Sequence, residues 1–408
     1  MEPDRNPFAP GAGAQPPELT GRGVVLDRAS IILRRIAGGY HDRSCLLIGL
    51  RGVGKTVLLN RIQGAARDIG YIAVLLEAPE DRRLADLLAP ALRRILLRLD
   101  QVQGLKHKLH EAMGVLRAFA STFKVTIGDI GVGIEPPRGL ADSGALDSDV
   151  TDLLVAVGEA AAEGRTSVGL LIDELQYVAE EELAALLAGL HRVAQLSLPL
   201  VVFGAGLPQL VGLTGKAKSY AERLFEFTTI GPLAPDDARA AVHDPIERQG
   251  VVITDDALDE IVRVTEGYPY FLQEWGARTW LSAPVSPITL EDVGRATADA
   301  TAALDQGFFR VRFDRLTPAE KDYLRAMAEL GAGPHRSGDI AEMLGRTVDQ
   351  VAPTRANVIA KGMAFAPAYG DTAFTVPMFD AFMHRVIPEF VPRPPRRRVS
   401  HRRTSKKP

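Results

Sequence analysis

The sequence predicts an α/β fold with a parallel sheet, followed by a smaller helical domain and a module of helices and short strands. Three observations support this. Short apolar runs alternate with helical patterns through the first half of the chain, a glycine-rich motif follows the first run, and strand signals stop near residue 235. Such alternation is typical of a doubly wound sheet. We expect a disordered leader (1–17), a sheet domain (18–234), a helical domain (235–307), a helix-and-strand module (308–390) and a disordered basic tail (391–408).

The length and charge of the chain restrict its class. The 408 residues are 46% hydrophobic and 24% charged, as in a globular chain too long for one core. Removing the eight Arg and Lys residues of the tail from the net charge of −3 leaves −11 for the rest. The body is therefore a poor binder of polyanions, and any general attraction to nucleic acid comes from the tail. A solvated chain end without a partner is the alternative interpretation of the tail.

The chain has one cysteine, Cys45, which excludes an internal disulfide framework and a cysteine-based zinc cluster. The leader is rich in Pro, Gly and Ala and lacks the apolar core of a signal peptide. No later run approaches the roughly 18 apolar residues of a membrane span. The histidines are scattered, and no nucleophile motif such as GxSxG occurs. We expect a cytoplasmic protein without a membrane segment.

Five apolar runs have the pattern of buried parallel strands. They lie at 45–49, 72–77, 168–173, 200–204 and 227–230. A long amphipathic stretch follows the second run, at about 84–123, and a glycine-rich segment at 124–137 is compatible with a hairpin insertion. The sequence leaves the role of this insertion open.

The strongest functional signal is GLRGVGKT, residues 49–56, which fits the pattern GxxxxGK[ST]. It follows a predicted strand and opens a predicted helix, which is the context of a phosphate-binding loop. Glycines at 49, 52 and 54 let backbone N–H groups surround a phosphate. The Lys55 ammonium neutralises β- and γ-phosphate oxygens, and the Thr56 hydroxyl is a ligand for Mg²⁺. The alternative, a chance glycine-rich turn, does not account for the flanking strand and helix.

A second signal lies about 120 residues downstream, where the apolar run from residue 168 ends in Asp173 and Glu174. In a phosphate-transfer site Asp173 would hold the Mg²⁺ shell, and Glu174 would act as the general base on the attacking water. The alternative is that one of these acids only caps the following helix. The phosphate motif favours the catalytic interpretation.

The two motifs resemble those of AAA+ ATPases of the origin-recognition-complex type and their relatives, the STAND signalling ATPases, over about residues 18–390. The resemblance implies a P-loop (ASCE/AAA+) ATPase domain with a helical lid and a C-terminal winged helix. Gly21 and Arg22 resemble the "GR" segment that lies against adenine in the family, with a helix-entry turn as the alternative. Arg223 stands where the family carries an arginine finger, which implies a homo-oligomer. An Arg paired with a carboxylate on a solvated helix face is equally compatible with Arg223.

Two departures from the family pattern imply slow hydrolysis. The fourth strand ends in GAG (204–206), where the family usually has a polar sensor of the γ-phosphate, unless Gln209 takes that role. Tyr270 stands where clamp-loader and origin ATPases have a lid arginine. The segment GYP, which ends at Pro269, is closer to the STAND pattern, in which the lid packs over bound nucleotide and release is slow. The resemblance thus implies a slow ATP- and ADP-dependent switch.

The module at 308–390 shows three helical patterns, two short strands and a closing helix, which indicate a winged helix-turn-helix. Thr317 and Glu320 form a capping box at the start of the first helix. Because Pro353 is tolerated only near a helix start, we expect the main part of the third helix to begin there. The other expected elements are a helix at 338–344 and strands at 363–366 and 373–376.

DNA binding by this module would use its third helix in the major groove, with Arg355, Asn357 and Lys361 available and the wing on phosphates. The module's charge argues against this, because residues 308–390 contain ten basic and ten acidic side chains. A packing or partner surface is the alternative. We expect its aromatic residues in the core rather than on bases, namely Phe365, Tyr369, Phe374, Phe379 and Phe382.

Three functions remain compatible with the sequence. The favoured one is a slow ATP·Mg²⁺-dependent AAA+/STAND-like ATPase switch, with DNA as a candidate partner through the module and the tail. The alternatives are a DNA-binding regulator in which the nucleotide is structural, and a protein-interaction scaffold. The sequence names neither a DNA site nor a protein partner.

Overall fold

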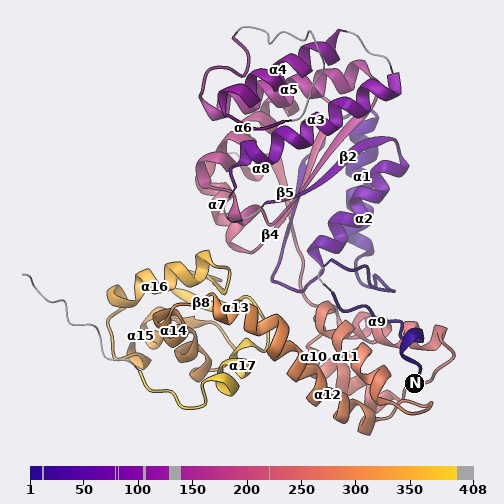
Figure 1. Cartoon of the computed structure of the whole chain (residues 1–408), viewed down its shortest axis with the longest axis vertical. Helices are drawn as coiled ribbons and strands as arrows, with labels where there is room; N and C mark the ends of the chain where they lie inside the picture. The colour runs from indigo at the N-terminus through magenta and orange to yellow at the C-terminus, as the bar shows by residue number, and fades with distance from the viewer. Residues whose placement is uncertain are drawn as a thin grey trace, which may run out of the picture. The chain divides into compact units, whose positions relative to one another are not determined.

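A computed structural model describes residues 1–11, 13–78, 80, 82–103, 107–127, 139–219 and 221–392. The chain divides into two compact units, which separate at residue 300 (Figure 1). Most of the predicted insertion at 124–137 and of the predicted basic tail at 391–408 lies outside the described residues. Within the described residues, no helix combines the length and the apolar character that crossing a bilayer requires.

The first unit contains a parallel sheet of five strands among the described residues. The strands are β1 (Ser44–Ile48), β2 (Tyr71–Glu77), β3 (Ser167–Asp173), β4 (Leu200–Gly206) and β5 (Phe225–Thr229). Their order is β2-β3-β4-β1-β5, and every neighbouring pair is parallel. Each predicted strand is confirmed to within two residues at each end, and the predicted α/β fold is confirmed with it.

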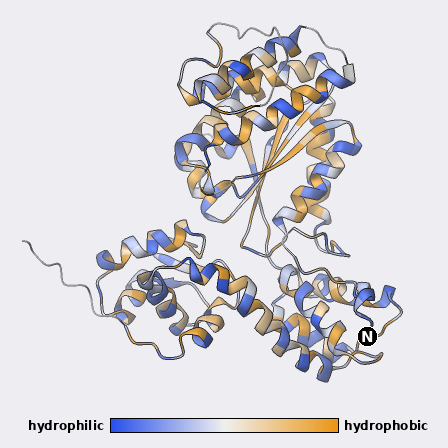
Figure 2. Ribbon diagram, in the orientation of Figure 1, coloured by the Kyte–Doolittle hydropathy of each residue, from blue (hydrophilic) through white to orange (hydrophobic). Residues whose placement is uncertain are grey.

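Helices cover both faces of this sheet (Figure 1). Two of them, α1 (Gly23–Ala37) and α2 (Lys55–Asp68), lie on one face. The other described helices of the sheet domain are α3 (Leu84–Gln103), α4 (Lys108–Thr122), α5 (Leu146–Glu163), α6 (Glu180–Gln195), α7 (Gln209–Ala217) and α8 (Ala221–Leu224). Because both faces are covered, every residue of β3 and β4 is buried, and Figure 2 shows the strands as strongly apolar elements.

The glycines that end β4 have a packing reason. A Cβ atom at Gly204 would lie 2.3 Å from Leu175 Cδ1 and 2.4 Å from Leu46 Cδ2. Any side chain here would overlap the core between β3 and β1, because interiors are packed without free volume of that size. A polar sensor side chain is therefore excluded at Gly204 because Leu46 and Leu175 occupy the space that it would need.

The change from strands to helices near residue 235 occurs as predicted. The helical domain contains α9 (Pro235–Arg248), α10 (Asp255–Thr265), α11 (Pro269–Ser282) and α12 (Leu290–Leu304). Proline is the first residue of both α9 and α11, where its missing N–H costs no hydrogen bond.

The leader differs from the expected disordered chain. Residues Pro3–Arg5 form a single helical turn, and the side chain of Phe8 is only 6% exposed. Several hydrogen bonds tie the first nine residues to the helical domain. The prediction of a disordered leader is thus wrong for these residues. Their composition favours disorder, but contacts with the distant helical domain order them.

The second unit contains α13 (Arg310–Asp314), α14 (Pro318–Glu329), β6 (His335–Arg336), α15 (Ser337–Met343), α16 (Val348–Ala360), β7 (Ala364–Phe365), β8 (Asp371–Phe374) and α17 (Phe379–Val386). The strands form an antiparallel sheet in the order β6-β8-β7. The capping box of Thr317 and Glu320 is confirmed. The two-residue strand β6 was not predicted, because it is too short to show alternation.

Two expectations for this unit are wrong. Helix α16 begins at Val348, behind a second capping box formed by Thr347 and Gln350, and Pro353 lies inside it. Because Pro353 has no N–H, the carbonyl oxygen of Asp349 in the first turn loses its helical hydrogen bond. The capping box stabilises the start of the helix enough to offset this loss. Tyr369 is fully exposed in the turn between β7 and β8 rather than in the core. Phe374, Phe379 and Phe382 are buried as predicted.

Candidate nucleotide site

The loop between β1 and α2 has the backbone of a phosphate cradle. Gly52 and Gly54 have φ angles of +81° and +90°, which are left-handed values that favour glycine. At Gly49 the reason is space, since a Cβ atom there would lie 2.2 Å from the carbonyl oxygen of Ile230. The loop leads into the N-terminus of a 14-residue helix, whose free N–H groups and dipole attract anions.

Lys55 places a buried cation in this cradle. Its residue is 7% exposed, and Nζ donates to the carbonyl oxygens of Gly49 at 2.9 Å and Leu50 at 2.8 Å. Burial lowers the pKa of Lys55 to about 8, although the carboxylates of Glu174 and Asp173 act in the opposite direction. Among the described residues, no carboxylate oxygen lies within 4 Å of Nζ. The ammonium is therefore held by neutral acceptors in a place where an anion would be strongly attracted.

Thr56 and Asp173 meet as the sequence predicted. Thr56 Oγ1 donates to Asp173 Oδ2 at 2.5 Å, although the two residues are 117 positions apart. The contact forms because β1 and β3 run parallel, so the loops after both strands lie at the same edge of the sheet. Burial raises the pKa of Asp173, and the hydrogen bond from Thr56 partly opposes that shift. A hydroxyl and a carboxylate are oxygen donors of the kind that Mg²⁺ prefers.

Glu174 does not cap the following turn. It has a left-handed φ of 55°, and its side chain makes no capping hydrogen bond. The carboxylate instead accepts a hydrogen bond from Gln176 Nε2 and lies 3.8 Å from Arg51 Nη1. Arg51 Nη2 also donates to Tyr177 Oη at 2.6 Å. The capping alternative is therefore wrong for Glu174, whose carboxylate is held beside the phosphate loop.

Gln176 was missed by the sequence analysis. Its Oε1 accepts the N–H of Leu207 at 3.0 Å, while its Nε2 donates to Glu174. A Cβ atom at Gly206 would lie 2.9 Å from that Oε1 and 2.7 Å from Leu210 Cδ2, so the end of β4 has room only for glycine. The amide that contacts Glu174 therefore belongs to Gln176, directly after β3. Gln209, which the sequence offered in place of the missing polar sensor, is the first residue of α7. The sequence shows only a glutamine two residues after the paired acids, and its burial becomes visible in the structure.

We expect Gln176→Leu to lower ATP turnover about tenfold and to leave ATP affinity within threefold of wild type. The substitution removes a hydrogen bond that orients Glu174, and a bond of this kind is worth about 1.4 kcal/mol. Steady-state turnover and binding of a fluorescent ATP analogue measure the two effects. Gln195→Leu, on an exposed position at the end of α6, is the matched control. Unchanged turnover in Gln176→Leu would contradict this role.

Gly21 and Arg22 lie between the phosphate loop and the helical domain. Arg22 is 9% exposed and donates to the carbonyl oxygens of Val53 at 3.2 Å and Gly231 at 2.5 Å. Burial lowers the pKa of Arg22, and the charge of Asp237 opposes the shift. Gly21 has a φ of +69°, and a Cβ atom there would lie 2.6 Å from the carboxylate of Asp237. Arg22 therefore holds the backbone of the phosphate loop at Val53, and Gly21 lets the chain pass close to Asp237 of α9.

Pro269 brings the helical domain to the phosphate loop. It is the first residue of α11, and the N–H of the next residue, Tyr270, donates to the carbonyl oxygen of Gly52 at 3.1 Å. Gly267 has a φ of +70°, and a Cβ atom there would lie 2.6 Å from the carbonyl oxygen of Leu233. The first turn of α11 thus contacts the cradle through its backbone.

Arg223 lies away from the phosphate loop of its own chain. It is exposed on α8, directly before β5. Ser44 pairs with Phe225 at the amino ends of β1 and β5, whereas the phosphate loop follows the carboxyl end of β1. The structure therefore does not bring Arg223 together with Lys55, Thr56, Asp173 and Glu174.

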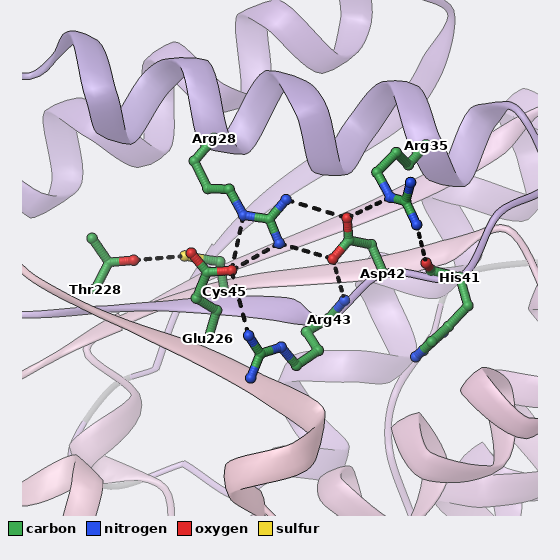
Figure 3. Close-up of polar contacts among 8 residues, drawn as sticks. All are labelled: Arg28, Arg35, His41, Asp42, Arg43, Cys45, Glu226 and Thr228. Atoms are coloured by element: carbon green, nitrogen blue, oxygen red, sulfur yellow. Dashed lines mark hydrogen bonds and ion pairs between the residues drawn. The ribbon is translucent and has the colours of Figure 1, made fainter.

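A polar network fixes the amino end of β5 against α1 (Figure 3). Arg28 donates to Glu226 at 2.9 Å and to Asp42 at 2.9 Å, and Arg35 also pairs with Asp42. Hydrogen bonds to Glu226 and Asp42 raise the pKa of Arg28. Beneath the network, burial raises the pKa of Cys45 to about 11, so its thiol stays protonated at neutral pH.

Comparisons with known proteins show which families and folds this chain is similar to. Residues 18–203 match the model of the AAA ATPase domain, and residues 306–383 match a domain of unknown function (DUF8462). The chain is similar to the Walker-type ATPase PABY2304 of Pyrococcus abyssi, with 17% identity, a TM-score of 0.53 and coverage of 91% of this chain and 97% of that chain. It is also similar to the ORC2 protein of Aeropyrum pernix in its ADP form, with 16% identity, a TM-score of 0.49 and coverage of 93% and 98%. No curated protein matches the sequence.

Proposed function

We propose that this chain, whose residues 18–203 form an AAA ATPase domain, is a slow nucleotide-dependent switch that binds ATP with Mg²⁺. The observation that carries the proposal is the buried ammonium of Lys55, which has neutral carbonyl oxygens as its hydrogen-bond acceptors at a helix N-terminus. Charged phosphate oxygens would compensate this cation far better than the carbonyls do.

Each chemical role in the site has a residue that fits it. Thr56 and Asp173 would hold Mg²⁺, which, when bound, neutralises charge on the β- and γ-phosphates. Glu174 would take the proton of the attacking water, and Gln176 orients its carboxylate. Gly49, Gly52 and Gly54 shape the cradle for the phosphates. The family match supports ATP hydrolysis. We assign the steps of that reaction to these side chains.

We infer slow turnover from the groups that the helical domain and the end of β4 present to the phosphate loop. The helical domain contributes the backbone N–H of Tyr270, where family members of the clamp-loader and origin types have an arginine. The end of β4 contributes glycine rather than a polar side chain, because Leu46, Leu175 and Gln176 fill the space. Fewer charged groups then stabilise the transition state, and positioned charge is the main source of rate in phosphoryl transfer.

We expect turnover below about 1 s⁻¹ per subunit, the lower end of typical enzyme rates. Because Arg223 is distant from its own phosphate loop, we propose that it acts on a neighbouring copy. Turnover per subunit should then rise with protein concentration, and Arg223→Ala should lower it on the order of a thousandfold without changing ATP affinity.

The measurement is ATP turnover over a range of protein concentrations, with Arg192→Ala on exposed α6 surface as the matched control. A rate that does not depend on concentration and survives Arg223→Ala would mean a self-contained site. A basal rate of many per second would overturn the inference of slow turnover.

DNA recognition by α16 is not favoured. The order α14-β6-α15-α16-β7-β8 is compatible with the expected winged helix-turn-helix, but the two cationic side chains predicted to contact DNA have partners inside the module. Arg355 donates to Thr372 Oγ1 at 2.8 Å, and Lys361 donates to Glu320 Oε2 at 2.7 Å. The exposed residues of α16 include no cation, and they are Val348, Asp349, Gln350, Ala352, Pro353, Ala356, Asn357 and Ala360. We therefore prefer a packing role for Arg355 and Lys361 to the expected contact with DNA.

A further inference from the structure

The N-terminal segment is attached to the helical domain along several residues (Figure 1). The amino group of Met1 donates to the carbonyl oxygen of Ala283 at 2.6 Å, and Trp280 Nε1 donates to the carbonyl oxygen of Glu2 at 2.9 Å. Asn6 Nδ2 donates to the carbonyl oxygen of Ala277 at 3.1 Å. These contacts all lie at α11 or directly after it.

Phe8 is the apolar anchor of this segment. Its ring packs on Gly276 in the middle of α11, where a Cβ atom would lie 2.7 Å from the nearest ring carbon. Glycine inside a helix costs about 1 kcal/mol relative to alanine, so this glycine has a reason other than helix stability. The reason that the structure supplies is room for the Phe8 ring.

Five residues later the same segment passes beside Thr56, the last residue of the phosphate-loop motif. Gly13 has a left-handed φ of +72°, and a Cβ atom there would be 3.4 Å from Thr56 Cγ2. Thr56 is the residue assigned to Mg²⁺, so the backbone at Gly13 passes beside the edge of the cradle. A side chain at this point would be disfavoured mainly by the left-handed backbone.

Beyond Gly13 the chain returns to the helical domain. Arg248, at the end of α9, donates to the carbonyl oxygen of Pro17 and pairs with Glu18. Thr20 Oγ1 donates to the carbonyl oxygen of Asp237 at 2.9 Å. The segment is thus fixed to the helical domain before and after the point at which it meets Thr56.

We propose that this segment, the described residues among 8–17, is a strap across the phosphate site that is anchored by Phe8 and slows nucleotide release. The proposal rests on the proposed function, because it requires a nucleotide in the cradle. Apart from Phe8, the strap contains Gly, Ala, Gln and Pro and no charged side chain. It therefore covers the site without competing for Lys55, and its prolines limit the ways in which it can move aside.

The test measures release of a fluorescent ADP analogue from the full chain after a chase with unlabelled ADP. Phe8→Ala removes the aromatic ring that anchors the strap. Gly276→Ala adds a methyl group on α11 that displaces the Phe8 ring from its site. We expect release to be about tenfold faster in both variants. Because the added methyl group also overpacks this site, the melting temperature of each variant is measured beside its release rate, and faster release at a wild-type-like melting temperature excludes a general loss of folding.

Gly294→Ala is the matched control, because Gly294 also lies inside a helix, is exposed and has no atom within 4 Å of its added Cβ. Wild-type release rates in both anchor variants would overturn the strap and leave the nucleotide site standing. Faster entry with unchanged release would also overturn it, since the segment would then only block an empty site. If the wild-type chain does not bind the analogue, the nucleotide site and the strap both fail.

Discussion

Glu174→Gln should leave ATP bound and reduce its hydrolysis at least a hundredfold. The amide has nearly the same shape as the carboxylate and can still bond to Gln176, but it cannot accept a proton from water. General base catalysis typically contributes a factor of 10² to 10⁴, which sets the size of the effect. A single-turnover experiment with ATP and a binding titration measure the two quantities.

Glu181→Gln, on an exposed position of α6, is the control for loss of one acidic charge. Hydrolysis at the wild-type rate in Glu174→Gln would place the base elsewhere. Glu174 makes no helix-capping hydrogen bond, so its left-handed φ of 55° is not explained by capping. A wild-type rate in Glu174→Gln would therefore leave this strained backbone without a functional explanation.

Lys55→Ala should weaken ATP binding at least a hundredfold, which corresponds to about 2.7 kcal/mol. Its ammonium is the buried cation of the cradle, and the other cation of the loop, Arg51, is turned towards Tyr177 and Glu174. We expect the melting temperature of the unliganded protein to be unchanged or higher, because the substitution removes a buried charge that has no ion pair among the described residues.

Calorimetric or fluorescence titration measures the affinity, and Lys216→Ala on the exposed surface of α7 is the control. Wild-type affinity in Lys55→Ala would refute the phosphate site. A loss of affinity together with a large drop in melting temperature would instead mean that Lys55 is structural, and the melting measurement separates the two cases.

The parts of the fold that were predictable from the sequence have local signals. Buried parallel strands are continuous apolar runs, so all five strands were found, and the spacing of residues 49–56 fixed the phosphate loop. The contact of Thr56 with Asp173 followed because parallel strands end at one edge of the sheet. Residues 18–203 match the model of the AAA ATPase domain, which agrees with the AAA+ part of that resemblance.

The parts that were not predictable depend on tertiary contacts. Phe8 carries no local signal that it packs on Gly276, which is 268 positions away, and Gln176 is recognisable only once Leu207 is beside it. Arg355 looks like a free cation on a helix until β8 is placed against it. In each case composition and spacing describe the residue correctly, while its partner comes from a distant part of the chain.

The buried thiol of Cys45 makes this chain convenient for spectroscopy. With a raised pKa and 4% exposure, it should react slowly with maleimides, and the sequence contains no second cysteine. Cysteines introduced at exposed positions can therefore carry spin labels or fluorophores in an otherwise native sequence. Pairs of such probes would report the distance between the leader and the sheet domain through a nucleotide cycle without any need for a cysteine-free background.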